Sequence, residues 1–149
     1  MIALHPALRV GLMTAVLAVA GCGTNPMMAS SSTASYVATL SAAAEVPPNP
    51  SAGSGSLDAK LDKTTGVLSW TLTYAGLSGP ATAAHFHGPA APGSNAGVVV
   101  PLANPASPIQ GQATLSAGQI ADLSAGNWYV NVHTAAHPGG EIRGQVTAK

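Results

Sequence analysis

Four histidines stand in two close pairs in the C-terminal half of the chain. His85 and His87 are separated by one residue in "TAAHFHGPA", and His133 and His137 are separated by three in "NVHTAAHPGGEIRGQ". The only other histidine in the sequence is His5, near the N-terminus. Imidazole nitrogens are good ligands for Zn, Cu, Fe and Ni. We therefore hypothesise one mononuclear metal site with these four histidines as ligands.

The first pair lies in a segment that has the pattern of a strand. Residues two apart in a strand point to the same side of the sheet. His85 and His87 therefore share one face, and Phe86 lies on the other. Because Phe86 is apolar, we expect it in the core and both imidazoles on the outer surface.

The segment "NWYVNVHT" alternates in the same way. Its apolar residues Val130 and Val132 predict a core face, which leaves three residues on the outer face: Tyr129, Asn131 and His133. The second histidine pair thus reaches the outer surface independently of the first. Tyr129 and Asn131 would support the metal ligands from behind, as outer groups commonly do; the alternative is ordinary strand surface.

His137 and Arg143 complete the set of candidate site residues. His137 follows the strand, in a loop closed by a Pro-Gly-Gly sequence, and Arg143 lies on the polar face of the next strand. If His137 is not a ligand, we expect its ring to bond a backbone carbonyl and stiffen the turn. The alternative for Arg143 is an ion pair with Glu141 or Glu45, or a solvated strand face.

The elements that must position these residues are predicted to be strands. Period-two alternation recurs along residues 35–149, and the runs are separated by turn sequences rich in Gly, Pro, Asn and Asp. About eight short strands of this kind predict an all-β, antiparallel Greek-key sandwich or barrel. One short helix is expected in "SAGQIADLSAG", with Ser116 as N-cap, Gln119 at the third helical position and Gly126 as the stop.

The N-terminal segment predicts export. Residues 1–21 contain Arg9 and a short apolar run that ends in "VAGC", which resembles the lipoprotein box in which Cys22 is acylated. The alternative is a simple secretory signal cut nearby. Residues 22–34 are then the lipidated cysteine and a tether, and residues 35–149 the folded domain. Gly23 favours outer-membrane attachment, so we expect a lipid-anchored protein at the periplasmic face of the outer membrane or the cell surface.

Composition excludes several function classes. Charged residues are 7% of the chain and the net charge is zero, so a basic surface for nucleic acid is lacking. Cys22 is the single cysteine, which rules out a disulfide within the chain. No Gly-x-Ser-x-Gly motif indicates a serine hydrolase, and five acidic residues offer little for a paired-carboxylate site.

Four stretches together resemble the CHRD domain family: "AAEVPP", "AAHFHGPA", "GVVVPL" and "WYVNVHTAAHPGGEIRGQV". The resemblance covers roughly residues 36 to 147, and it is to the bacterial, exported lipoprotein form of the domain. It supports the fold and the compartment, and it assigns no reaction.

The His-x-His pair is also similar, more distantly, to the copper site of copper-zinc superoxide dismutases. That resemblance implies a redox metal, Cu or Fe, held by His85 and His87 and completed by His133 and His137. Arg143 would then guide superoxide, or another small anion, to the metal. The chain lacks the disulfide and the histidine-rich loop of a second zinc site, so only a mononuclear dismutase is implied; zinc in the same ligands would be structural.

A different class of function fits the same sequence. A lipid-anchored CHRD domain could be a non-catalytic module that binds a protein, a glycan or a matrix component, or it could buffer periplasmic copper. The sequence also leaves open whether the chain forms a homo-oligomer and whether all four histidines share one metal.

Overall fold

The computed structural model describes Met1 and residues 32–149. The predicted signal peptide, Cys22 and most of the tether lie outside these described residues. Within them, no helix is both long enough and apolar enough to cross a membrane.

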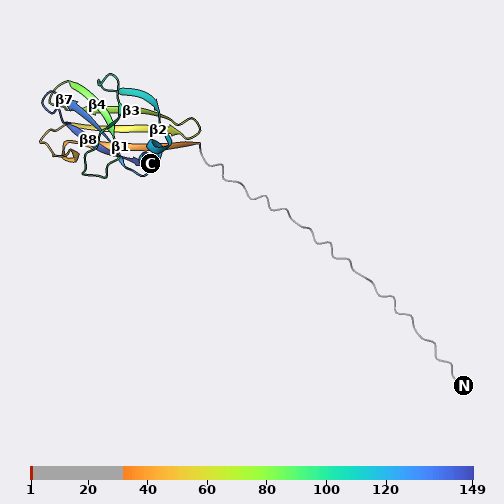
Figure 1. Cartoon of the computed structure of the whole chain (residues 1–149). Coiled ribbons are helices and arrows are strands. Elements are labelled where there is room, and N and C mark those ends of the chain that lie inside the picture. Colours follow the sequence, from red (N-terminus) through yellow and green to blue (C-terminus); the bar gives the residue numbers. More distant parts are fainter. Residues whose placement is uncertain (2–31) are drawn as a thin grey trace.

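Eight antiparallel strands of the described residues form one sheet, which curls into a nearly closed barrel. Figure 1 shows β1, β2 and β3 running side by side. The order of strands across the sheet is β5-β4-β7-β8-β1-β2-β3-β6. The predicted all-β class is confirmed. The strands are β1 (Thr33–Ser41), β2 (Ser54–Asp62), β3 (Val67–Ala75), β4 (Ala81–His87), β5 (Val98–Pro101), β6 (Ile109–Thr114), β7 (Trp128–Thr134) and β8 (Ile142–Ala148).

The core follows the period-two pattern of the sequence. Along β2, Leu57, Ala59 and Leu61 are at most 3% exposed, while the residues between them face outward. The indole of Trp70 on β3 meets the ring of Phe86 on β4 edge to face, with centroids 5.2 Å apart. Since β3 and β4 are not neighbours in the sheet, this contact crosses the barrel interior.

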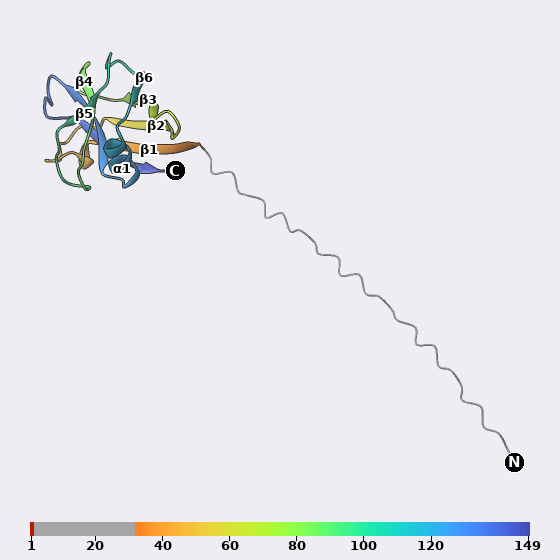
Figure 2. The same cartoon turned by 45° about the vertical axis from the view of Figure 1, so that its right-hand side comes forward.

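Two short helices complete the fold. The 3₁₀-helix η1 (Ala42–Ala44) follows β1, and α1 (Ala117–Ser124) precedes β7. The predicted capping box of α1 is confirmed: Ser116 and Gln119 each accept a hydrogen bond from the other's backbone N–H. Figure 2 shows α1 close to β1. The hydroxyl groups of Tyr36 and Ser124 join these two elements at 3.1 Å.

The first strand begins slightly earlier than the expected domain start at Ser35. Thr33 pairs with Asp62 and Ala34 pairs with Leu61 across β1 and β2. The sequence assigns these two residues to the tether because their surroundings lack a hydrophobic period, yet β2 extends far enough to pair with them.

Candidate metal centre

Strands β4 and β7 place the histidines side by side. They are antiparallel neighbours, with His85 opposite Asn131, His87 opposite Tyr129 and His133 opposite Ala83. All three imidazoles lie on the face of the sheet that turns away from the core, as the strand pattern predicts. The inward residues Phe86, Val130 and Val132 are fully buried on the other face.

Three of the four predicted ligands form a cluster. One ring nitrogen from each of His85, His87 and His133 can be chosen so that all lie within 4.8 Å of one another. Nδ1 of His85 is 3.0 Å from Nε2 of His133. Three imidazoles at this spacing are a donor set suited to a transition metal.

His137 is not part of this cluster. It sits in the turn between β7 and β8, where its backbone N–H donates to the carbonyl of Thr134 and its carbonyl accepts from Gly140. Its half-buried side chain lines a separate surface cavity of about 250 Å³, together with Glu45 and Pro138. The structure thus places the fourth histidine beside the site and outside its donor set.

The cluster is much less exposed than the sequence predicted. His87 is 8% exposed, His133 is 9% exposed, and Asn131 between them is 2% exposed. The cause is the segment 88–97, which folds back over this face: Nδ1 of His87 lies 3.0 Å from the Ala96 carbonyl oxygen. Strand periodicity gave the correct side of the sheet, but it carries no information about a loop that covers that side.

Backbone carbonyls fix the proton position on two of the rings. Nδ1 of His87 faces the Ala96 oxygen, and Nδ1 of His133 faces the Pro138 oxygen, each at 3.0 Å. A carbonyl only accepts hydrogen bonds, so each Nδ1 carries the proton and each Nε2 of the neutral ring keeps a lone pair. Metal-bound histidines commonly have such a carbonyl partner on the far nitrogen.

The electrostatics of the cluster favour neutral imidazoles. Burial lowers the pKa of His85 below its usual value, and the neighbouring His133 and His87 lower it further. Burial also lowers the pKa of His133, against the opposite effect of the Pro138 carbonyl. Both rings are therefore unprotonated at neutral pH, which is the form that binds a metal.

Tyr129 joins the cluster to Arg143. Its ring stacks in parallel on His87, with centroids 4.7 Å apart, and the guanidinium carbon of Arg143 lies 3.4 Å from the centre of the same ring. Because β7 lies between β4 and β8, the tyrosine is flanked by one residue from each neighbouring strand.

Arg143 is buried, and its hydrogen bonds hold the covering segment. The side chain is 2% exposed; one NH₂ group donates to Oδ1 of Asn95 at 2.9 Å and the other to the Ser94 carbonyl at 2.6 Å. Among the described residues, the ion pair found is that of Lys149 with Asp58. The alternative ion pair of Arg143 with a glutamate is therefore not formed within 4.0 Å.

Sequence reasoning missed the importance of Glu45. Its carboxyl group is 5% exposed, and Oε1 has no hydrogen-bond partner among the described residues. Burial raises its pKa, against opposing effects from Arg143 and from a hydrogen bond with the Asn131 side chain. The available signal was a carboxylate in the otherwise apolar stretch "AAEVPP".

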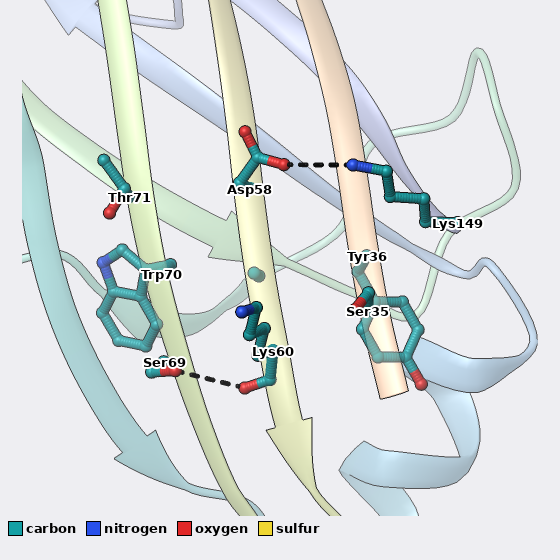
Figure 3. A pocket seen from close by; sticks show the side chains of 9 residues that line it. Ser35, Tyr36, Asp58, Lys60, Ser69, Trp70, Thr71 and Lys149 are labelled. Carbon is teal, nitrogen blue, oxygen red and sulfur yellow. Dashed lines mark hydrogen bonds and ion pairs between the residues drawn. The ribbon is translucent and has the colours of Figure 1, made fainter. Parts of the chain in front are cut away.

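Another surface hollow lies on β1, β2 and β3, away from the histidines (Figure 3). Its lining includes Asp58, Lys60, Trp70 and Lys149. It contains no histidine, so it offers none of the chemistry that distinguishes the cluster on β4 and β7.

Comparison with known proteins gives one family. The model of the CHRD domain family matches residues 36–146. No curated protein and no solved structure matches the chain.

Proposed function

The chain belongs to the CHRD domain family, and from this premise we propose that it binds one metal ion at His85, His87 and His133 and dismutates superoxide. The observation that carries the proposal is the cluster of three imidazoles with ligand atoms within 4.8 Å. The Nε2 lone pairs of His87 and His133 are directed by backbone carbonyls on the opposite side of each ring. Such an arrangement supports a preformed metal site.

The choice of reaction rests on the donor set and on the analogy with copper-zinc superoxide dismutases. A bound Cu or Fe ion would supply the single accessible one-electron couple through which two superoxide anions and two protons become oxygen and hydrogen peroxide. Zn in the same site would make the protein redox-silent. The partly exposed His85 marks the side from which a small anion would approach.

Arg143 lies beneath the segment 88–97, so it would attract that anion without touching it. Its guanidinium is buried and bound to Asn95 and Ser94, so its positive charge reaches the site as a local field and without direct contact. A fixed charge near a site raises the encounter rate with an anion in a salt-dependent way. Arg143 would therefore guide the anion through its field alone.

We propose that the protein is exported from the cytoplasm and held at a membrane by a lipid. Cys22 and the apolar run before it lie outside the described residues, and their sequence supports acylation and a lipid anchor. This compartment suits a defence against external superoxide.

A second candidate function is a copper buffer. Two of the three ligands are less than 10% exposed, which favours retention of a metal over rapid exchange with substrate. The same cluster would then hold copper without turnover.

One experiment separates these functions. The full chain with Cys22→Ala, which removes the only thiol, is purified without a histidine tag, loaded with Cu, Fe or Zn, and analysed for metal content. Superoxide dismutation is then measured for each loaded form. We expect one metal per chain and dismutation with Cu or Fe.

The matched comparison uses two double variants. His85→Ala with His87→Ala should abolish metal uptake, whereas His5→Ala with His137→Ala removes the same number of imidazoles and should preserve it. Protein that takes up none of the three metals stoichiometrically contradicts the metal site. Stoichiometric metal without dismutation would leave the buffer or a structural role.

A further inference from the structure

The amide oxygen of Asn131 occupies the middle of the histidine cluster. Oδ1 lies 2.9 Å from Nε2 of His133 and 3.0 Å from Nε2 of His87, and the side chain is 2% exposed. Since the Nδ1 atoms of these rings carry their protons, both Nε2 atoms and Oδ1 present lone pairs to one another. Three acceptors at this spacing are unfavourable unless a cation lies among them.

Glu45 opposes the rotation of the amide that would relieve this contact. The Asn131 side chain lies close enough to Glu45 to lower the pKa of its carboxyl group. A Cβ built on Gly140 would lie 2.8 Å from Nδ2 of Asn131 and would overlap Oε1 of Glu45, so the NH₂ end of the amide and the carboxylate share one niche. A flipped amide would place its oxygen in this niche, where it would face the carboxyl oxygens of Glu45 without a hydrogen between them.

The distances between donor atoms match neighbouring ligands on one metal. They run from His85 Nδ1 to His133 Nε2 at 3.0 Å, on to Asn131 Oδ1 at 2.9 Å, and on to His87 Nε2 at 3.0 Å. Two ligands about 2.0–2.1 Å from a metal lie about 2.9 Å apart at 90° and about 3.4 Å apart at the tetrahedral angle. The observed spacing therefore favours a planar over a tetrahedral arrangement.

The distances between the imidazole rings agree with this order of ligands around the metal. Centroids of His87 and His133 are 6.4 Å apart, compared with 4.9 Å for His85 and His133 and 5.5 Å for His85 and His87. The widest pair is the one that would lie on opposite sides of a planar site, with Asn131 and His85 between them.

We propose that Oδ1 of Asn131 is the fourth ligand of the metal and that Glu45 is a positioning residue that holds the amide in this orientation. The resulting set of three nitrogens and one oxygen in a near-plane is typical of Cu(II) or Ni(II), and of the two redox metals in the proposed function it favours copper. This inference rests on the three-histidine site of the proposed function and specifies its fourth ligand, its geometry and its metal.

The first test needs no change at the site. The full chain with Cys22→Ala is loaded with one equivalent of Cu(II) and studied by pulsed EPR in D₂O. With the amide oxygen as a ligand, the equatorial plane holds no water, so strongly coupled deuterons of equatorial water should be absent. An equatorial water beside three coordinated imidazoles would overturn the assignment of Asn131 and leave the histidine site intact.

The second test changes the ligand. Asn131→Leu should weaken Cu(II) binding by at least about 10-fold and introduce equatorial water. Asn131→Asp combined with Glu45→Gln, which keeps an oxygen at the same place without bringing two carboxylates together, should bind Cu(II) without that water. Circular dichroism establishes that each variant is folded. Unchanged Cu(II) affinity and EPR spectrum in folded Asn131→Leu would contradict the proposal, while absence of Cu(II) binding to the parent chain would contradict the proposed function as well.

The role of Glu45 has its own readout. Glu45→Gln keeps an oxygen that can accept from the amide, so its Cu(II) EPR parameters should stay close to those of the parent. Glu45→Leu removes that acceptor and should shift the parameters towards those of Asn131→Leu. Identical EPR parameters in Glu45→Leu and the parent would remove Glu45 from the positioning role.

Discussion

Nδ1 of His133 lies 3.0 Å from the carbonyl oxygen of Pro138, in the turn that also carries His137. The turn therefore supplies a backbone acceptor to the histidine cluster, while the imidazole of its own histidine faces a different cavity. The contact sets which nitrogen of His133 is available to a metal. Three members of the two histidine pairs lie in the cluster, and His137 lies outside it.

Metal binding should stabilise the fold only through the cluster. A metal that binds only the folded chain raises the free energy of unfolding by about 2.7 kcal/mol when its free concentration is 100 times its Kd. We expect this gain with Cu(II) in the parent chain and in His137→Ala, and none in His133→Ala. Urea unfolding with and without the metal measures it, and a gain in His133→Ala equal to that of the parent would place the metal elsewhere.

Glu141 should make stability depend on pH in the acid range. Its carboxylate is fully buried and accepts from Ser51, from the backbone and hydroxyl of Ser78, and from Thr134. Burial alone would raise its pKa, but these hydrogen bonds lower it to about 2 from 4.5.

The lowered pKa of Glu141 sets the pH window of the effect. A depressed carboxyl pKa stabilises the fold above the unfolded-state value, and the stabilisation is lost as the pH falls from about 4.5 towards about 2. The difference corresponds to about 3 kcal/mol at neutral pH. Glu141→Gln should lower the free energy of unfolding by about 2–4 kcal/mol at pH 7. In this variant the free energy of unfolding should also change much less between pH 4.5 and pH 2.5. Urea unfolding from pH 7 to pH 2.5 tests both; an unchanged acid profile in the variant would show that another group carries it.

Much of the fold was predictable because it depends on local pattern. The alternation of Leu57, Ala59 and Leu61, the capping box of Ser116, and the shared face of His85 and His87 are all properties of short segments. Each feature depends on residues that are close in the sequence, so the same pattern gives the same local structure in other proteins.

The features that the sequence did not predict depend on contacts between distant segments. The burial of His87 requires residues 88–97 to fold over it, and the burial of Arg143 requires the same segment to accept its hydrogen bonds. Glu45, which follows η1, meets Asn131 in the middle of β7 because both side chains lie against Gly140. The hydrophobic periodicity of a single segment contains no information about such long-range contacts.

Gly140 should be the least replaceable glycine next to the site. Its φ is +129°, a backbone conformation that disfavours side chains, and an added Cβ would overlap the Glu45 carboxylate. Gly140→Ala should destabilise the fold by about 2–3 kcal/mol and weaken metal binding, because it displaces Glu45 and Asn131 together. The neighbouring Gly139→Ala is the control, since its Cβ would meet nothing within 4 Å. Equal stability of the two variants, measured by urea unfolding, would contradict this packing.

Arg143 combines a structural role with the proposed guidance of superoxide, and two substitutions distinguish these roles. Arg143→Met removes the charge and both hydrogen bonds to Ser94 and Asn95, and it should destabilise the fold by about 2–4 kcal/mol. Arg143→Lys keeps the charge but cannot make the same pair of bonds, so it should lose stability while retaining a dismutation rate that falls as salt is added.

The informative measurement is kcat/KM for superoxide as a function of ionic strength, with the copper content of each variant determined in parallel. We expect the salt dependence in the parent and in Arg143→Lys, and a flatter profile in Arg143→Met, because only the last lacks the positive charge beneath residues 88–97. If Arg143→Met keeps the salt dependence of the parent, its guanidinium serves to fasten this segment over His87 and Tyr129, and the attraction of the anion has another source.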